Sequence, residues 1–313
     1  MTRRCRHRRE HRCLLVPLLV VALLGFCSGA TLTPQNEELS VEVLSFNIRY
    51  GTARDGKNHW DRRRESVIRL LREQNSDVVG LQEALRFQIE VILAAMPEYG
   101  DVGVGRDDGQ TRGEYCGILY RRGRFTVADS GTFWFSDTPE VPGSITWGNA
   151  CTRICTWARL VDKGSGRGIY VYNLHLDHIS QPSREKSAVL LGKRIQKRTL
   201  PDPFVVLGDF NVGEDNPAIE HLKDASGLAL RDSFRVLHPD AENVGTFNGF
   251  KGRRKGDKID YVLVSPAAQV KEADIVLTSY GGRWPSDHFP VRALLRFPLS
   301  TGDSEATSSS SEP

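Results

Sequence analysis

The stretch FVVLGDFN (204–211) runs five apolar or glycine residues directly into Asp209 and Asn211. A short valine-rich run bounded by polar residues predicts a buried β-strand whose end carries both polar side chains. Because side chains alternate between the two faces of a strand, Asp209 and Asn211 are expected to point to the same side. This strand end is the first candidate for a polar cavity at the edge of a sheet.

Other predicted strands repeat this pattern of apolar residues that end or begin in a polar one. They are VEVLSFNI (41–48) with Asn47, DVVGLQE (77–83) with Glu83, IYVYNLHL (169–176) with His175, and IDYVLV (259–264) with Asp260. Asp177 follows the third of these strands, in step with His175. If the strands share one sheet, these polar ends are expected to lie side by side.

Helical segments alternate with the strands. Residues 61–73, 86–96 and 183–198 have helical apolar spacing, and Asn216-Pro217 predicts a helix start. Residues 40–298 show no internal repeat, and strands and helices interleave along them. This order predicts one folded domain of the α/β or α+β class.

The first 30 residues resemble a secretory signal peptide in composition. Six arginines precede a 14-residue apolar run (14–27), which is followed by small residues at 28–30. The alternative is an uncleaved membrane anchor, but a span takes about 20 apolar residues, and Pro17 interrupts this run. We therefore predict a secreted or periplasmic protein with no stable membrane span after cleavage.

Charge and termini limit the functions further. Without residues 1–30, the 42 basic and 39 acidic residues fall to 36 and 38, a net charge of −2. A chain so close to neutral lacks the long-range field that draws strongly basic proteins to nucleic acid.

Residues 299–313 form an acidic, serine-rich tract, which predicts a disordered tail. No cysteine spacing in the sequence predicts a zinc site.

Acids gathered at one sheet edge predict a metal ion. Each polar strand end alone is better explained by a turn or a helix cap. Several carboxylates brought together need a cation, since two of them about 4 Å apart repel by roughly 4 kcal/mol at an effective dielectric near 20. Oxygen ligands favour Mg²⁺ or Mn²⁺ over zinc. The candidate ligands are Glu83, Asp209, Asn211 and Asp287.

Six short motifs occur along the chain in a fixed order. They are FNI (46–48), LQE (81–83), NLHLDH (173–178), GDFN (208–211), KIDY (258–261) and SDH (286–288). In this order they resemble the endonuclease/exonuclease/phosphatase superfamily, which contains pancreatic deoxyribonuclease, abasic-site endonucleases, bacterial sphingomyelinases and inositol polyphosphate 5-phosphatases. The resemblance covers about residues 41–297. The stretches SFNIRYGT, GLQEALRFQ and GTFWFSDTPEVPGS look most like a bacterial-type exported branch of undefined substrate.

The resemblance implies a fold and a metal site. The fold would be a four-layer sandwich in which two mixed β-sheets pack face to face with helices outside. Glu83 would be the principal ligand of Mg²⁺ or Mn²⁺, supported by Asn47 and Asp287. The implied activity is a metal-dependent hydrolase that cleaves phosphoric ester bonds by in-line attack of water.

The resemblance also implies catalytic roles. Asp209 and Asn211 would orient the attacking water and the phosphate. His288, paired with Asp260, would act on the phosphate or as general base, and His175 would lie across the phosphate from it. An acid at Glu114 would orient His175. Whether Asp209 or His288 is the base stays open.

Three further residues are candidates for substrate binding. Arg254 lies in a basic loop (251–258), Arg153 lies in NACTRICTW (149–157), and Asp177 follows His175. The basic loop is equally well explained as a solvated surface. The expected partner is a phosphate ester, either a small or sugar phosphate or, as the alternative, DNA or RNA. A non-catalytic binding protein is a remote third possibility, and no obligate protein partner is expected.

Overall fold

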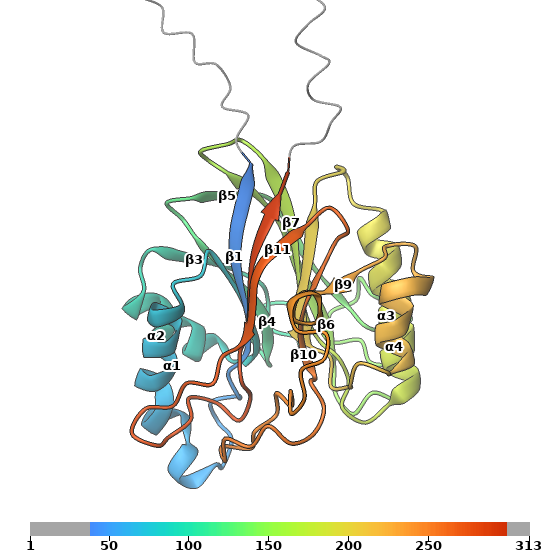
Figure 1. Cartoon of the computed structure of the whole chain (residues 1–313). Coiled ribbons are helices and arrows are strands. Elements are labelled where there is room, and N and C mark those ends of the chain that lie inside the picture. Colours follow the sequence, from blue (N-terminus) through green and yellow to red (C-terminus); the bar gives the residue numbers. More distant parts are fainter. Residues whose placement is uncertain (1–37, 299–313) are drawn as a thin grey trace, which may run out of the picture. The chain divides into compact units, whose positions relative to one another are not determined.

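The structure is a computed structural model, and it describes residues 38–298 of the 313-residue chain. The predicted signal peptide (1–30) and acidic tail (299–313) lie outside the described residues. Two six-stranded sheets form the middle of the described part (Figure 1).

The first sheet has the strand order β11-β12-β1-β2-β4-β3. It is mixed, because β1 and β2 pair in parallel while the other neighbours are antiparallel. Its strands are β1 (Leu39–Asn47), β2 (Val78–Ala84), β3 (Tyr99–Val102), β4 (Tyr115–Arg121), β11 (Gln269–Ile275) and β12 (Val291–Phe297).

The second sheet has the order β5-β6-β7-β8-β10-β9, with β7 and β8 as its parallel pair. Its strands are β5 (Phe125–Trp134), β6 (Ile154–Asp162), β7 (Gly168–His175), β8 (Phe204–Asp209), β9 (Arg231–Asp232) and β10 (Asp260–Val264). In both sheets the parallel pair therefore brings two carboxyl-terminal strand ends to one edge.

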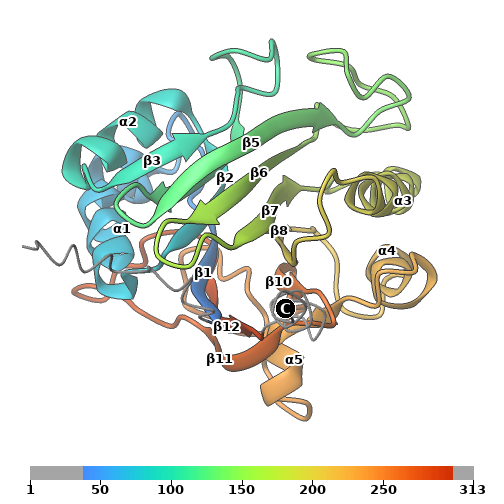
Figure 2. The same cartoon turned by 90° about the horizontal axis from the view of Figure 1, so that it is seen from above.

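Helices cover the outer face of each sheet (Figure 2). Helices α1 (Trp60–Gln74) and α2 (Arg86–Ala95) pack on the first sheet, and α3 (Gln181–Gln196) packs on the second. The short elements are η1 (Gly56–Asn58), α4 (Pro217–Glu220), η2 (His221–Ala225) and α5 (Ser233–Leu237). The start of α4 follows the prediction, since the side chain of Asn216 accepts a hydrogen bond from the backbone N–H of Ala218.

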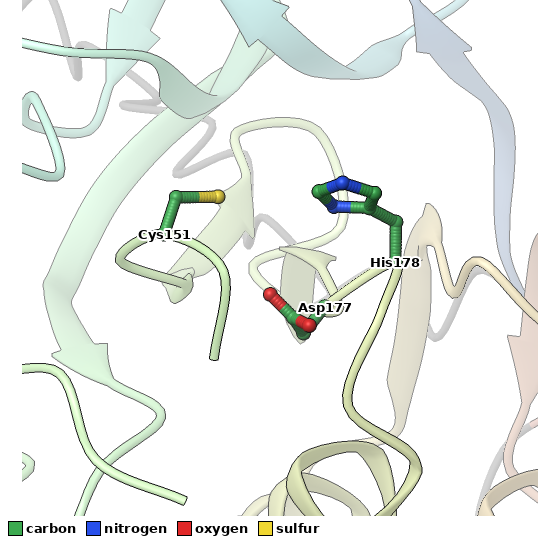
Figure 3. A group of neighbouring side chains, drawn as sticks. All are labelled: Cys151, Asp177 and His178. Atoms are coloured by element: carbon green, nitrogen blue, oxygen red, sulfur yellow. The ribbon is translucent and has the colours of Figure 1, made fainter. Parts of the chain in front are cut away.

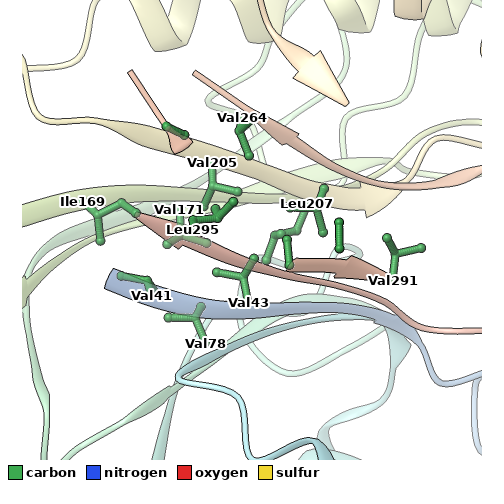
Figure 4. Packing of buried hydrophobic residues seen from close by; sticks show 14 of the residues in the cluster. Val41, Val43, Val78, Ile169, Val171, Val205, Leu207, Val264, Val291 and Leu295 are labelled. Atoms are coloured by element: carbon green, nitrogen blue, oxygen red, sulfur yellow. The ribbon is translucent and has the colours of Figure 1, made fainter. Parts of the chain in front are cut away.

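The two sheets share an apolar core. Val43 from β1, Val171 from β7 and Leu207 from β8 are each fully buried between the sheets (Figure 4). Each such side chain contributes about 1.5–3 kcal/mol when it leaves water. The predicted four-layer sandwich, with helices outside two face-to-face mixed sheets, is therefore confirmed. Within residues 38–298, none of the helices has both the length and the apolar character needed to cross a bilayer.

Candidate active site

Three neighbouring strands of the second sheet place three candidate residues in a row. In the register of the sheet, Asp209 pairs with His175 on β7 and with Asp260 on β10. Asp209 is 1% exposed, and its Oδ2 lies 3.4 Å from His175 Nε2. Strand pairing alone thus brings these three groups together. The expectation that all the polar strand ends share one sheet was wrong, because the strands of Asn47 and Glu83 belong to the other sheet.

The first sheet contributes Asn47 and Glu83. The side-chain amide of Asn47 donates to Glu83 Oε1 at 3.1 Å and to Asp209 Oδ2 at 2.9 Å. Asn47 is fully buried, so these two bonds join β1 to β2 and to β8 of the opposite sheet. Asn47 therefore fixes the carboxylates of the two sheets relative to each other.

His288 and Asp260 form a buried pair. His288 Nδ1 lies 2.9 Å from Asp260 Oδ2, and its Nε2 lies 3.8 Å from Asp209 Oδ2. Burial disfavours the charged ring, but Asp260 and then Asp209 outweigh it and hold the pKa of His288 well above its usual value. Burial, with the negative charge of Asp260, raises the pKa of Asp209 to about 7.

The pKa of His175 is shifted in the opposite direction to that of His288. Burial, reinforced by the positive charges of Arg153 and Arg106, lowers the pKa of His175 well below its usual value. Its Nε2 lies 2.9 Å from the side-chain amide nitrogen of Asn211. Near neutral pH these surroundings therefore favour the protonated form of His288 and the neutral form of His175.

A cavity of about 680 Å³ opens over these groups. The predicted residues that line it are Glu83, Glu114, Arg153, His175, Asp209, Asn211, Asp287 and His288. Asn47 and Asp260 are not among the lining residues, since both are fully buried behind it and hydrogen-bonded to residues that do line it. The sequence-based set is thus largely gathered in one place.

Asp177 and Arg254 do not line the cavity. Asp177 is fully buried, and its oxygens accept hydrogen bonds from the backbone N–H groups of Ala150, Ile179 and Ser180. It therefore shapes the loop beside Arg153 and does not face a substrate. In the basic loop, Lys255 reaches the cavity in place of Arg254.

The predicted orienting role of Glu114 differs in detail from the structure. Its carboxylate binds Arg106 Nη1 at 2.7 Å, and no hydrogen bond joins it to His175 among residues 38–298. Burial raises the pKa of Glu114. Arg106 lines the cavity but was missed, because it lies in a loop with no strand-end pattern to mark it. Arg49 also lines the cavity and was likewise not singled out, although it follows FNI directly.

Cys151, Asp177 and His178 lie together (Figure 3), close enough to suggest a second metal site, and Cys151 and His178 line the cavity. The contacts favour a structural role. Both oxygens of Asp177 already accept backbone hydrogen bonds, and Arg153 Nη2 lies 2.8 Å from His178 Nδ1. A cation there would meet the guanidinium of Arg153, so this cluster is better explained as the support of that arginine.

Three of the eight non-glycine residues with positive φ among residues 38–298 line the cavity. Arg49, Glu83 and Asn211 have φ of 58°, 57° and 55°, in the left-handed region that non-glycine residues rarely adopt. All three residues lie at or just past the ends of β1, β2 and β8 and line the cavity. Such strain persists where the surrounding structure holds it in place, and it often marks a functional site.

Comparison with known proteins agrees with this geometry. The family described as "Endonuclease/Exonuclease/phosphatase family" matches residues 44–288. The chain belongs to this family. A family member of known structure from Bacteroides thetaiotaomicron is 32% identical, with a TM-score of 0.78, and the match covers 84% of this chain and 100% of that one.

Two other similar proteins extend the comparison. A mannosyl-6-phosphatase of Bacteroides thetaiotaomicron is 33% identical, with a TM-score of 0.76, over 82% of this chain and 99% of its own. An uncharacterized protein of Acanthamoeba polyphaga mimivirus is 29% identical over 80% of this chain and 98% of its own length. Membership of the endonuclease/exonuclease/phosphatase family places the chain among enzymes that act on phosphoric ester bonds.

For this family member we predict a pH-dependent stability that originates at His288. In metal-free protein, replacing His288 with asparagine is expected to cost about 3 kcal/mol, because it leaves Asp260 and Asp209 without their cation. Since the folded pKa of His288 lies above its unfolded value, this contribution is complete below about pH 6.5 and is lost as pH rises through the folded pKa. Urea unfolding in EDTA between pH 5 and 9 measures it, and a pH-independent difference would contradict the prediction.

Proposed function

We propose that the chain is a divalent-metal-dependent phosphoesterase that hydrolyses its substrate by in-line attack of water. The observation that carries this proposal is the position of Asp209. Its Oδ2 lies 3.4 Å from one histidine, His175, and 3.8 Å from another, His288, at the floor of an open cavity. A phosphate above Asp209 would meet this carboxylate as a proton acceptor, and it would meet His175 and His288 as donors on two sides.

The residues of the first sheet suit a hard cation. Glu83 and Asp287 present carboxylates to the cavity, and a positively charged guanidinium, that of Arg49, already lies within 4 Å of both. Carboxylate oxygens are the donors that favour Mg²⁺ or Mn²⁺. Asn47, predicted as a third ligand, presents its amide nitrogen to Glu83, and its Oδ1 accepts from the Arg49 N–H, so it positions Glu83 from behind and does not reach the ion. When bound, such an ion neutralises charge that develops on the phosphate oxygens.

The electrostatics suggest which group is the base. Asp209, with a pKa near 7, takes up a proton from water at neutral pH more readily than an ordinary carboxylate. His288 already carries a proton and can donate it to a phosphate oxygen. Asn211 and neutral His175 then hold the opposite side of the phosphate. We therefore assign the base to Asp209, a point that sequence reasoning left open.

A small or sugar phosphate is the substrate class we favour. The net charge of −2 without residues 1–30 gives little attraction for a polyanion, and a relative with 33% identity is a mannosyl-6-phosphatase. Lys255 and Arg153 both line the cavity and would anchor the substrate through its phosphate. A nuclease is the second candidate for the activity. We also propose that the protein is exported, on the basis of the predicted signal peptide.

The test is hydrolysis by the purified protein with Mg²⁺ or Mn²⁺. The substrates are sugar 6-phosphates, bis-p-nitrophenyl phosphate and supercoiled plasmid. We expect phosphate release from the monoesters, abolished by EDTA and restored by added metal, with the plasmid intact. Nicking of the plasmid at comparable rates would favour the nuclease, and activity that resists EDTA would contradict the metal site.

A further inference from the structure

Arg49 places a positive charge beside the carboxylates that we assign to the metal. Its Nη1 lies 3.8 Å from Glu83 Oε2, and its Nε lies 3.7 Å from Asp287 Oδ2. These distances fall outside hydrogen-bond range, so the guanidinium acts on both acids mainly through its charge. Without a cation the two carboxylates would repel each other.

The guanidinium is fixed by other contacts. Asp55 accepts a hydrogen bond from its Nε at 3.1 Å and from its Nη2 at 3.2 Å. Such a two-point pair between a guanidinium and a carboxylate sets its orientation as well as its position. The guanidinium also lies 4.8 Å from the centre of the Tyr50 ring. It therefore cannot leave the site without breaking these contacts.

The main chain of Arg49 is held as firmly as its side chain. Its N–H donates to Asn47 Oδ1 at 3.0 Å, and its carbonyl accepts from Arg63 Nη2 at 2.8 Å and Gln88 Nε2 at 3.1 Å. These bonds maintain the left-handed conformation at φ 58°. A strained residue held on every side suggests that the position of its charge matters to the site.

We propose that Arg49 is a built-in counter-ion of the metal site, which keeps Glu83 and Asp287 together before the metal binds and makes the metal bind weakly and exchangeably. The inference rests on the proposed function, because it needs a divalent cation at these carboxylates. A fixed positive charge a few ångströms from the ion repels it, and low dielectric around the partly buried site strengthens the repulsion. Metal occupancy then follows the concentration of free cation in the surroundings.

The test is calorimetric titration of Mn²⁺ into the metal-free protein, which needs no substrate. Arg49→Gln is expected to lower the Mn²⁺ dissociation constant at least ten-fold, because the repelling charge is gone while a side chain of similar reach remains. Arg49→Lys keeps the charge and is expected to stay within about three-fold of wild type. Arg54→Gln removes the same charge from an exposed neighbour outside the cavity and is expected to change the constant less than two-fold.

Three results would overturn the inference. Equal or weaker Mn²⁺ binding by Arg49→Gln, with far-ultraviolet circular dichroism unchanged, removes the counter-ion role and leaves the metal site standing. If Arg49→Gln does not fold, Arg49→Lys decides. A large change in its Mn²⁺ dissociation constant would mean that the two hydrogen bonds to Asp55 matter and the charge does not. Absence of Mn²⁺ binding in wild type would overturn the proposed metal site, and the inference with it.

Discussion

Asp209→Asn is expected to lower the rate of phosphate-ester hydrolysis by about 10³-fold, within the range that a positioned acid or base contributes. The amide that replaces the carboxylate cannot take a proton from water. It can still accept the hydrogen bond from Asn47, because its side-chain oxygen can take the place of Oδ2. The measurement is kcat/KM on the best monoester found, with metal at saturation.

The same substitution is expected to leave the fold intact. A pKa near 7 means that the folded protein disfavours the ionised form of Asp209, so a neutral amide removes a cost at neutral pH. We expect the melting temperature of the metal-free variant to equal or exceed that of wild type. Asp215→Asn, at an exposed position outside the cavity, is the matched control and should retain full activity. A loss below ten-fold in Asp209→Asn would exclude Asp209 as the base.

Arg63→Leu is expected to destabilise the protein by about 3–5 kcal/mol. The guanidinium of Arg63 is buried, and it donates hydrogen bonds to four backbone carbonyls around the site. These carbonyls belong to Ile48, Arg49, Asn58 and Pro285. A leucine leaves buried carbonyl groups without partners, and it loses the contact with the Trp60 ring. The free energy of unfolding in urea measures the effect.

Arg62→Leu is the matched control for that experiment. Arg62 precedes Arg63 on α1 and is exposed, so its replacement is expected to change stability by less than about 0.5 kcal/mol. Burial lowers the pKa of Arg63 to about 10. Its charge is nevertheless kept at neutral pH, and so are its five donors. Equal stability of Arg63→Leu and Arg62→Leu would show that the carbonyls find other partners.

Sequence patterns predicted the fold, and they predicted most of the residues that the structure gathers around one cavity, because both follow from strands. The alternation of apolar and polar residues marks which strand ends meet, and strand pairing then aligns His175, Asp209 and Asp260. Past the strand ends the alternation no longer holds. Asn211 lies beyond β8 in a left-handed conformation, so its meeting with His175 does not come from simple alternation.

Loop residues could not be assigned from sequence. Arg49 and Arg106 lie in loops, where they bind Asp55 and Glu114, six and eight residues further along the chain. These contacts follow neither the strand nor the helix period, so no sequence pattern marks them. In the basic run at 251–258, by contrast, the sequence suggested a surface charge where the structure has a buried one. Lys258 lies 1% exposed with its ammonium 2.7 Å from Asp232, so part of a run that suggested a binding surface is a buried ion pair. Charge along a sequence does not reveal which charges stay in solvent.

The proposed metal ligands come mainly from one sheet and the proposed proton-transfer groups mainly from the other. The apolar side chains between the sheets, such as Val43, Val171 and Leu207, therefore set the spacing between the two groups. A core substitution that alters this thickness would shift one half of the site relative to the other, even where the fold survives. The volume of core residues that line no part of the cavity is therefore expected to affect the rate of hydrolysis.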